Sequence, residues 1–376
     1  MKLVFIVNTI DFFLSHRVDI CLESLKAGHR VHVITKYTED KIASLRRSGV
    51  VFHQLDFSRG GMNPIKELGD IATLYKIVKK IRPDIIHLII IKPYLYGGIV
   101  ARLVGVPAVV SAVSGLGILF SSSDLKYKLI RLSVYPLFQI AFGHKNQIVI
   151  FQNSTDRDIL INWKVVHVKK ARIIRGSGVR LSSFPFVSEP DNYPPVVSFA
   201  ARLLKDKGVE ILVEASRKLK DKKIDLDFWL IGEIDSGNKN SVTQRQLIAW
   251  EDEGLITLLG YRSDIANLFS KSNIIVLPSF YGEGLPKVLI EAAACGRAVI
   301  TTDHPGCRDA VEFDTSILVP IKDHVALAEA IQDLIQDSKK RQNMGKAGRR
   351  LAEQEFSIEK VVANHVQIYQ ELLSEV

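Results

Sequence analysis

Two glutamates near a strand–loop–helix junction are the residues most able to do chemistry. Glu283 lies in a glycine-containing loop after the apolar run 273–278, and Glu291 lies on the helical pattern that follows. Pro286 is expected at the first helical position and Gly296 where the helix stops. A helix start directly after a glycine loop aims several backbone N–H groups at one point. The stretch therefore predicts an anion site flanked by two carboxylates.

Glu291 has an ordinary alternative. It follows Lys287 by four residues, so the two could form a surface ion pair worth about 0.2–0.5 kcal/mol. The same helix is apolar nearly all round, which favours burial, and a buried carboxylate needs a specific partner. Both interpretations stay open from this segment alone.

Arg202 and Lys207 form a second candidate group. They follow an apolar strand and precede a helical pattern that begins after Gly208. A forked guanidinium and a compact ammonium at the end of a strand suit a diphosphate. Two basic residues beside a loop are more often simply solvated. Their position relative to the strand and the helix therefore has to distinguish a diphosphate site from an ordinary surface.

Three segments together resemble the family-four retaining glycosyltransferases, which use nucleotide sugars. The segments are Glu283-Gly-Leu-Pro-Lys-Val-Leu-Ile-Glu291, with the family's E-x7-E spacing, Phe199-Ala-Ala-Arg202-Leu-Leu-Lys-Asp-Lys207-Gly208, and Leu258-Leu-Gly260-Tyr-Arg-Ser-Asp-Ile265. They occur in the family's order, and the likeness covers essentially the whole chain. The resemblance implies an α/β protein of GT-B fold, with two Rossmann-like, doubly wound parallel-sheet domains facing across a cleft.

The resemblance also implies roles on the donor side. Arg202 and Lys207 would bind the nucleotide diphosphate, and Glu283 would lie by the donor sugar as the third catalytic residue. Glu291 would hold the ribose. The remaining donor contacts would come from the helix start, the base site and the phosphate side: Gly284, Leu285, Pro286, Gly260, Tyr261 and Gly306.

The acceptor side is less typical of the family. His16 lies where the first strand gives way to a helix, but residues 10–14 stand where many relatives have a glycine-rich loop. Ser114 and Gly115 lie in a second glycine-containing loop, where relatives often carry a histidine or an acid. The resemblance therefore implies acceptor contacts at His16, Ser114 and Gly115, with Ser114 the nearest match.

Composition limits the class of protein. The chain has 376 residues, 47% of them hydrophobic, enough for two ordinary cores. Its three cysteines suit a reducing cytosol, and no apolar run reaches the ~18–20 residues that span a bilayer. The N-terminus does not look like a secretory signal. We expect a cytoplasmic protein, peripheral on the cytoplasmic face of the inner membrane, that needs no metal and no cofactor beyond a UDP-sugar donor.

Strand-like runs alternate with helical patterns along the chain, as expected for parallel sheets. Strands are expected at 2–7, 30–35, 50–55, 84–90, 107–112, 146–151, 196–200, 226–231, 255–259, 273–277 and 298–302. The Pro-, Ser- and Gly-rich region 176–195 is expected to link an acceptor-side domain, 1–175, to a nucleotide-sugar domain, 196–356. By resemblance, the terminal helix 357–376 would pack back on the first domain.

Charge is unevenly distributed. Residues 1–175 carry a net charge of +14, from 26 Lys and Arg against 12 Asp and Glu, within a total of +9. The pattern 124–142 mixes Lys126, Lys128 and Arg131 with leucines and aromatics, and Pro136 is expected to kink or end it. An ordinary core helix is the alternative. The charge favours an anionic membrane surface, because each nearby basic residue contributes about 1 kcal/mol there.

The leading hypothesis is a retaining glycosyltransferase that moves a sugar, of N-acetylhexosamine type, from a UDP-sugar to a polyprenyl-diphosphate-linked saccharide. Segments 57–64, 92–97 and 113–117 resemble bacterial enzymes that extend such undecaprenyl-linked glycans. The alternatives are a nucleotide-sugar epimerase of similar fold and a non-catalytic basic membrane- or nucleic-acid-binding protein. No basic–aromatic repeat, Walker loop or complete dinucleotide fingerprint is present, so nucleic acid is not expected as a partner.

Overall fold

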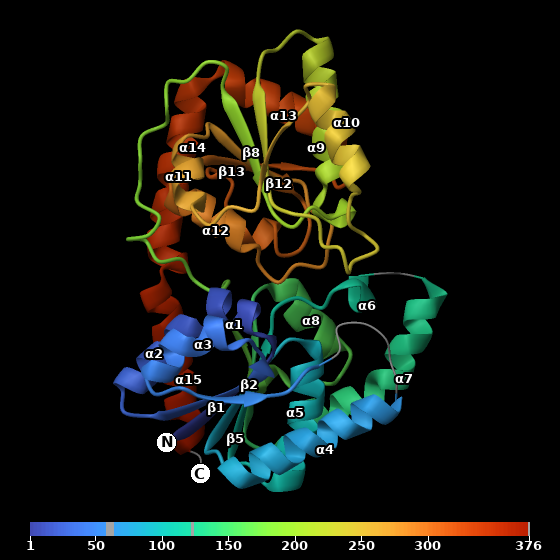
Figure 1. Ribbon diagram of the computed structural model, residues 1–376, viewed down its shortest axis with the longest axis vertical. Coiled ribbons are helices and arrows are strands. Elements are labelled where there is room, and N and C mark those ends of the chain that lie inside the picture. Colours follow the sequence, from blue (N-terminus) through green and yellow to red (C-terminus); the bar gives the residue numbers. More distant parts are fainter. Residues whose placement is uncertain (58–63, 122–123, 375–376) are drawn as a thin grey trace. The chain divides into compact units, whose positions relative to one another are not determined.

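A computed structural model describes residues 1–57, 64–121 and 124–374. The chain forms two compact units (Figure 1). Unit 1 comprises Met1–Ser177 and Glu359–Val376, and unit 2 comprises Gly178–Ile358. Each unit has its own parallel sheet and its own buried core.

Unit 1 contains a seven-stranded sheet of order β3-β2-β1-β4-β5-β6-β7, with every neighbouring pair parallel. Its strands are β1 Lys2–Thr9, β2 Arg30–Lys36, β3 Val51–Gln54, β4 Ile85–Ile89, β5 Ala108–Val113, β6 Gln147–Phe151 and β7 Ala171–Ile173. The six strands predicted for this region are confirmed within one or two residues. The short β7 was not predicted, because Ala171–Ile173 lacks a buried apolar run.

Helices join the strands of unit 1, as parallel pairing requires. They are α1 Ile10–His16, α2 Val18–Lys26, α3 Glu39–Arg47, α4 Pro64–Ile81, α5 Ile91–Val104, α6 Ile118–Ser121, α7 Leu125–Phe142, α8 Ser154–Asn162 and, from the end of the chain, α15 Ile358–Ser374. Most of segment 57–64, with Asn63, lies outside the described residues.

Side chains of α15 enter the core of unit 1. Tyr369 is buried, and its hydroxyl lies 2.6 Å from Nδ1 of the buried His87 on β4. The amide of Asn146 donates to the backbone carbonyl of Leu372 at 2.9 Å. The terminal helix is therefore part of unit 1 although most of that unit comes from the beginning of the chain.

Unit 2 contains a six-stranded parallel sheet of order β10-β9-β8-β11-β12-β13. Its strands are β8 Val196–Ala200, β9 Asp227–Ile231, β10 Thr257–Gly260, β11 Ile274–Leu277, β12 Ala298–Thr302 and β13 Ser316–Val319. Its α-helices are α9 Val209–Asp221, α10 Gln244–Asp252, α11 Ile265–Ser270, α12 Lys287–Ala294, α13 His324–Gln336 and α14 Ser338–Leu351. The first five strands were predicted, whereas β13 was not.

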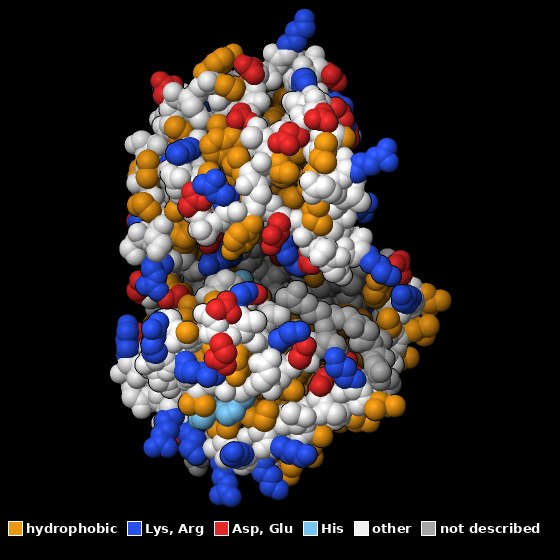
Figure 2. All heavy atoms as spheres, in the orientation of Figure 1, with side chains coloured by type: hydrophobic (Ala, Val, Ile, Leu, Met, Phe, Trp, Pro, Cys, Tyr) orange, Lys and Arg blue, Asp and Glu red, His pale blue; other side chains and the backbone are white. Residues whose placement is uncertain are grey.

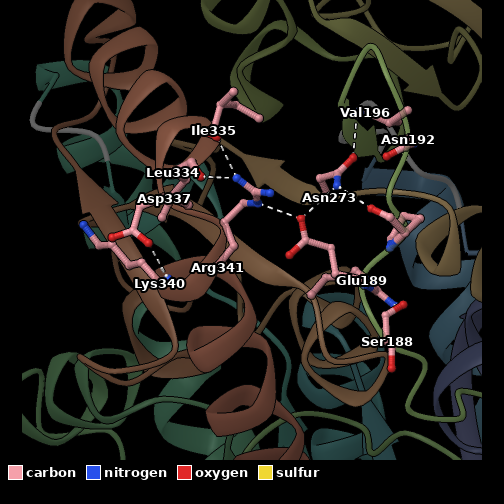
Figure 3. Close-up of polar contacts among 12 residues, drawn as sticks. Ser188, Glu189, Asn192, Val196, Asn273, Leu334, Ile335, Asp337, Lys340 and Arg341 are labelled. Carbon is pink, nitrogen blue, oxygen red and sulfur yellow. Dashed lines mark hydrogen bonds and ion pairs between the residues drawn. The ribbon is translucent and has the colours of Figure 1, made fainter.

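The segment before β8 is fastened to unit 2 by a buried network (Figure 3). Glu189 pairs with Arg341 of α14 at 2.7 Å, and both side chains are only 8% exposed. Arg341 also donates to the carbonyls of Leu334 and Ile335. Asn273, before β11, donates to Glu189 at 2.8 Å and accepts from the backbone N–H of Val196. From Gly178 onward, this segment is thus packed structure of unit 2.

Both sheets have a point where the chain order reverses. In unit 1 it lies between β1 and β4, and in unit 2 between β8 and β11. Loops at the carboxyl ends of the strands diverge there and leave room for a ligand. The expected site residues follow the strands at or beside these two points.

Two expectations about proline need correction. Pro136 does not end its helix, since α7 continues to Phe142. Pro286 occupies the N-cap of α12, with extended backbone, and the first helical residue is Lys287. Among the described residues, no helix combines the length and the apolarity needed to cross a membrane.

Candidate active site

An ion pair spans the chain reversal of unit 2. Lys207 ends a short 3₁₀ turn after β8, and Glu283 lies in the loop after β11; the Lys207 ammonium donates directly to a Glu283 carboxylate oxygen. The two side chains are 13% and 12% exposed. A partly buried pair at the carboxyl edge of a parallel sheet lies where this fold binds ligands. The structure therefore brings together two of the three predicted catalytic residues.

The loop after β11 is held against the turn after β8. The hydroxyl of Ser279 donates to Glu283 at 3.2 Å, and the backbone N–H of Phe280 donates to the carbonyl of Asp206 at 2.9 Å. Gly208 makes this approach possible, because a Cβ there would lie 2.2 Å from the carbonyl oxygen of Pro278. Both members of the Lys207–Glu283 pair are thus fixed by backbone contacts.

Gly306 packs on the back of this loop. It has φ of +83°, and a Cβ there would lie 2.6 Å from the Glu283 carbonyl oxygen and 2.8 Å from that of Gly284. The adjacent Cys307 is buried; burial, with the Glu283 charge next in size, raises the pKa of its thiol to about 12. The predicted site glycines Gly284 and Gly306 are therefore in direct contact, and Cys307 is a neutral packing residue.

The helix start and Glu291 complete this edge of unit 2. Leu285 is buried, and α12 begins after Pro286, whose side chain makes no capping hydrogen bond. Glu291 is half-buried, and burial raises the pKa of its carboxyl group, opposed by Lys287. The Lys287 ammonium lies 3.5 Å from the Glu291 carboxylate. The i,i+4 pair considered as the ordinary alternative exists, but in a desolvated setting.

Arg202 and the two residues predicted to line a base site, Gly260 and Tyr261, follow the neighbouring strands. Arg202, after β8, pairs with Asp235, after β9, at 2.8 Å, and its side chain is 53% exposed. Gly260 ends β10, and Tyr261 follows with 72% exposure. These residues lie at the same carboxyl edge as the Lys207–Glu283 pair, but Arg202 contacts Asp235 instead of that pair.

In unit 1, an unpredicted arginine lies beneath the expected acceptor residues. The guanidinium of Arg17 is buried and donates to the backbone carbonyl of His16 at 2.8 Å and to the hydroxyl of Ser114 at 3.4 Å. Burial lowers the pKa of Arg17 to about 10. Its Nε has no hydrogen-bond partner in the described part of the chain. Arg17 therefore links two of the three predicted acceptor residues; Gly115, with φ of +107°, follows Ser114.

The segment that replaces the expected glycine-rich loop is helical. Residues 10–14 belong to α1, which is capped by Thr9 and begins immediately after β1. His16 ends this helix, with its ring stacked 4.1 Å from the Phe12 ring. His87, by contrast, is a buried core residue bonded to Tyr369.

Sequence reasoning missed Arg17, Ser279 and Asp235 as neighbours of the site. Ser279 and Asp235 each follow a strand at the carboxyl edge of the sheet, and that position could have identified them from the sequence. Arg17 could not be identified in this way, because its burial is not visible in the sequence. In the described ranges 1–57, 64–121 and 124–374, no three His, Cys, Asp or Glu side chains cluster as metal ligands.

Comparisons with known proteins agree with this architecture. Residues 2–153 match the glycosyl transferase 4-like family, and residues 183–351 match the glycosyl transferases group 1 family. The chain belongs to these glycosyl transferases, and it is a hexosyltransferase. The epimerase and non-catalytic alternatives gain no support from these matches.

Two relatives are similar over most of the chain. An N,N'-diacetylbacillosaminyl-diphospho-undecaprenol alpha-1,3-N-acetylgalactosaminyltransferase of Campylobacter jejuni is 30% identical over 316 residues, 80% of this chain and 81% of that protein. A UDP-Gal:alpha-D-GlcNAc-diphosphoundecaprenol alpha-1,3-galactosyltransferase of Escherichia coli is 28% identical over 287 residues, 73% of this chain and 72% of the other.

Among solved structures, Anabaena HepE in complex with UDP and glucose superposes with a TM-score of 0.79, at 18% identity, over 98% of this chain and 99% of that one. The likeness shows the fold, which is GT-B. The predicted fold class is confirmed.

Proposed function

We propose that this protein is a retaining glycosyltransferase that moves an N-acetylhexosamine-type sugar from a UDP-sugar to a polyprenyl-diphosphate-linked saccharide. The observation that carries the proposal is the Lys207–Glu283 pair at the chain reversal of unit 2, in the loop that leads to the start of α12. The two named relatives support the substrate class, since both names specify acceptors linked to undecaprenyl diphosphate.

Unit 2 supplies the donor side of this proposal. Lys207, Arg202 and the first N–H groups of α12 stabilise negative charge on the departing nucleoside diphosphate, which grows as the bond to the sugar breaks. Lys207 exchanges part of its contact with Glu283 for the phosphate. Glu283, held by Ser279, then lies beside the donor sugar. Glu291 binds the ribose hydroxyls, where a half-buried carboxylate accepts hydrogen bonds.

The reaction is balanced without a further reactant. An acceptor hydroxyl oxygen bonds to the anomeric carbon of the donor sugar, on the face that the leaving group occupied. The bond from that carbon to the β-phosphate oxygen breaks, and its electron pair leaves with UDP. A β-phosphate oxygen takes the acceptor proton. The residues therefore position and stabilise charge, and no protein group has to form a covalent intermediate.

The acceptor side lies in unit 1. His16, Ser114 and Gly115 contact the acceptor, and Arg17 keeps the Ser114 hydroxyl oriented from beneath. Because Arg17 is buried, it acts through Ser114 and the His16 backbone as a positioning residue.

The protein docks peripherally on the cytoplasmic face of the inner membrane through α7. Leu125, Leu129 and Leu132 follow helical spacing and are 71%, 59% and 72% exposed. Lys126 and Lys128 on the same helix are also exposed. An exposed apolar stripe beside basic residues suits the interface of an anionic membrane.

Arg131 contributes less to this surface than the sequence suggested. Its guanidinium donates to the carbonyl of Leu119 at 2.6 Å and is half-buried. We therefore assign membrane attraction to Lys126 and Lys128, and insertion to the leucines.

Transfer assays test the proposed reaction. Purified protein is given UDP-N-acetylgalactosamine, UDP-N-acetylglucosamine, UDP-galactose or GDP-mannose, together with a synthetic polyprenyl-diphosphate-linked saccharide. We expect α-linked product from a UDP-sugar and none from GDP-mannose. Transfer only from GDP-mannose, a β-linked product, or no product with any donor would contradict the proposal.

Vesicle sedimentation tests the membrane surface. Leu129→Gln with Leu132→Gln should release the protein from anionic vesicles, and Lys126→Glu with Lys128→Glu should weaken binding in a salt-dependent way. Lys239→Glu with Lys346→Glu in unit 2 has the same change in charge and serves as the control. Equal sedimentation of all three variants would rule this surface out.

A further inference from the structure

A second basic site lies at the opposite end of the unit 1 sheet from His16 and Ser114. A concavity of about 430 Å³ opens at the amino ends of the strands, beside the edge strand β3. It is lined by Lys2, Arg30, His32, His53, Ile77, Lys80 and Ile81. Five of these seven side chains are basic, and none is acidic. In Figure 2, histidine atoms are visible on the surface of unit 1 among Lys and Arg side chains.

Sheet register brings these residues together. Lys2 on β1 pairs with Arg30 on β2, and His32 on β2 pairs with Val51 on β3. Paired residues in parallel strands point to one face, and so do residues two apart within a strand. Lys2, Arg30, His32 and His53 therefore share one face of the sheet. The last turn of α4 covers that face and adds Lys80.

The cations in this concavity have few anionic partners. The Lys2 ammonium donates to the carbonyl of Ile81 at 2.9 Å and so caps the C-terminus of α4. The carboxylate of Asp84 accepts from the backbone N–H of Lys2 at 2.6 Å. Within the described residues, the side chains of Arg30 and Lys80 make no ion pair and no hydrogen bond. Both therefore keep their donors available.

Two imidazoles form the floor of the concavity. Nδ1 of His32 and Nε2 of His53 lie 3.0 Å apart, so one ring donates to the other when both are neutral. Burial lowers the pKa of His32, and His53, Lys2 and Arg30 lower it further. Burial also lowers the pKa of His53, followed by the charge of Lys80. These are the charged groups that face the pair from β1, β2, β3 and α4.

We propose that this concavity is a binding site for a phosphate group, formed by Arg30, Lys80, His32 and His53. A guanidinium offers a fork that matches two phosphate oxygens, and the ammonium adds a point charge. The imidazole pair adds an N–H donor, and it takes up a proton when a dianion offsets the surrounding positive charge.

The shared chemistry allows two sources of the phosphate. It could belong to a phosphomonoester headgroup of a membrane lipid or to a small soluble phosphorylated molecule. In either case the site is separate from the donor and acceptor residues, because it lies at the amino ends of the strands whereas those residues follow the carboxyl ends. The proposal therefore stands or falls independently of the transferase mechanism.

The first test follows the histidine side chains of the full chain by NMR while inorganic phosphate is added at constant pH. We expect saturable shifts of His32 and His53 and an increase in the pKa of the pair. Arg30→Gln with Lys80→Gln should weaken phosphate binding about tenfold or more. Lys239→Gln with Lys346→Gln, which removes two positive charges from unit 2, should leave it unchanged.

Proton uptake is tested with sulfate, whose own charge is constant over the range used. Sulfate affinity should rise as the pH falls from 8 to 6, by at most about tenfold per pH unit for each proton taken up. His53→Gln should flatten this dependence. Unchanged histidine signals with phosphate, or equal phosphate binding by the two double variants, would overturn the site.

Vesicles separate the two sources. Vesicles that contain phosphatidic acid are compared with vesicles of phosphatidylcholine alone, in a protein that carries Leu129→Gln and Leu132→Gln to remove binding through α7. Sedimentation that requires Arg30 and Lys80 assigns a lipid headgroup. Phosphate shifts without such sedimentation assign a soluble ligand, and the absence of both contradicts the proposal.

Discussion

Unit 2 contains two largely buried ion pairs that differ in their surroundings. Glu189 and Arg341 lie in a network of backbone carbonyls and the amide of Asn273, which directly precedes β11 and so lies at the amino end of that strand (Figure 3). Lys207 and Glu283 lie at that edge, where two loops meet at the chain reversal. Their exposure is similar, at 8% for each member of the first pair and 13% and 12% for the second.

The comparison sets a structural ion pair against the pair that we propose acts on the donor. Arg341 donates to one carboxylate and two helix carbonyls, so its charge is fully used in holding the segment before β8. Lys207 faces Glu283 and the Tyr281 ring, where an incoming phosphate can compete for its donors. Similar burial therefore does not distinguish the two pairs, and the proposed role of Lys207 and Glu283 rests on their position at the carboxyl ends of the strands.

The largest effect expected from this comparison is on stability. Arg341→Met leaves Glu189 buried without its cation and should lower the free energy of unfolding by about 3–5 kcal/mol. Arg217→Met, which breaks exposed pairs on α9, should cost less than about 1 kcal/mol. Denaturant unfolding measures both. Equal losses in the two variants would show that the buried network contributes no more to stability than exposed ion pairs do.

Lys207→Ala should reduce transfer in addition to any loss of stability that follows from leaving Glu283 unpaired. Loss of a cation that stabilises the leaving diphosphate should reduce transfer by about 10²–10³-fold. Arg202→Ala should fall in the same range if its guanidinium moves from Asp235 to the phosphate. Steady-state kinetics on folded protein provide the measurement. Near-normal turnover in both variants would contradict the proposed role of Lys207 and Arg202 in binding the diphosphate.

Substitutions at two separate glycines test whether transfer requires the Glu283 loop to keep its position. Gly306→Ala would push a Cβ against the carbonyls of Glu283 and Gly284, whereas Gly28→Ala meets no atom within 4 Å at a similar φ of +78°. Each should cost about 1–2 kcal/mol in backbone strain. Only Gly306→Ala should also reduce transfer, by about tenfold or more, and equal activity would show that the loop tolerates displacement.

The smallest effect is expected at Glu291. Glu291→Gln keeps the shape of the side chain but weakens hydrogen bonds to the ribose, which are present before and during transfer. The KM for the UDP-sugar should rise by about tenfold with little change in kcat. A matched fall in kcat and kcat/KM would instead place Glu291 among the groups that act only in the transition state.

Much of the fold was predictable, because the strands of parallel sheets are short apolar runs separated by helical patterns. β7 was missed since Ala171–Ile173 is only three residues long and none of them is fully buried. β13 contains the short apolar run Ile317-Leu-Val319 and was nevertheless not predicted. Lys207, Glu283 and Gly306 were predictable by resemblance. Their contacts were not, because the approach of the two loops depends on Gly208 and on register between distant strands. Arg17 has no local signature, since its role comes from burial beneath Ser114.

Calorimetric binding of UDP and of uridine tests the central claim most directly. Lys207→Ala should weaken UDP binding at least about tenfold while leaving uridine binding unchanged, because only UDP carries the diphosphate. Lys205→Ala, an exposed neighbour paired with Glu210, is the matched control and should bind UDP normally. UDP binding that is the same in all three proteins would contradict the assignment of Lys207 to the diphosphate.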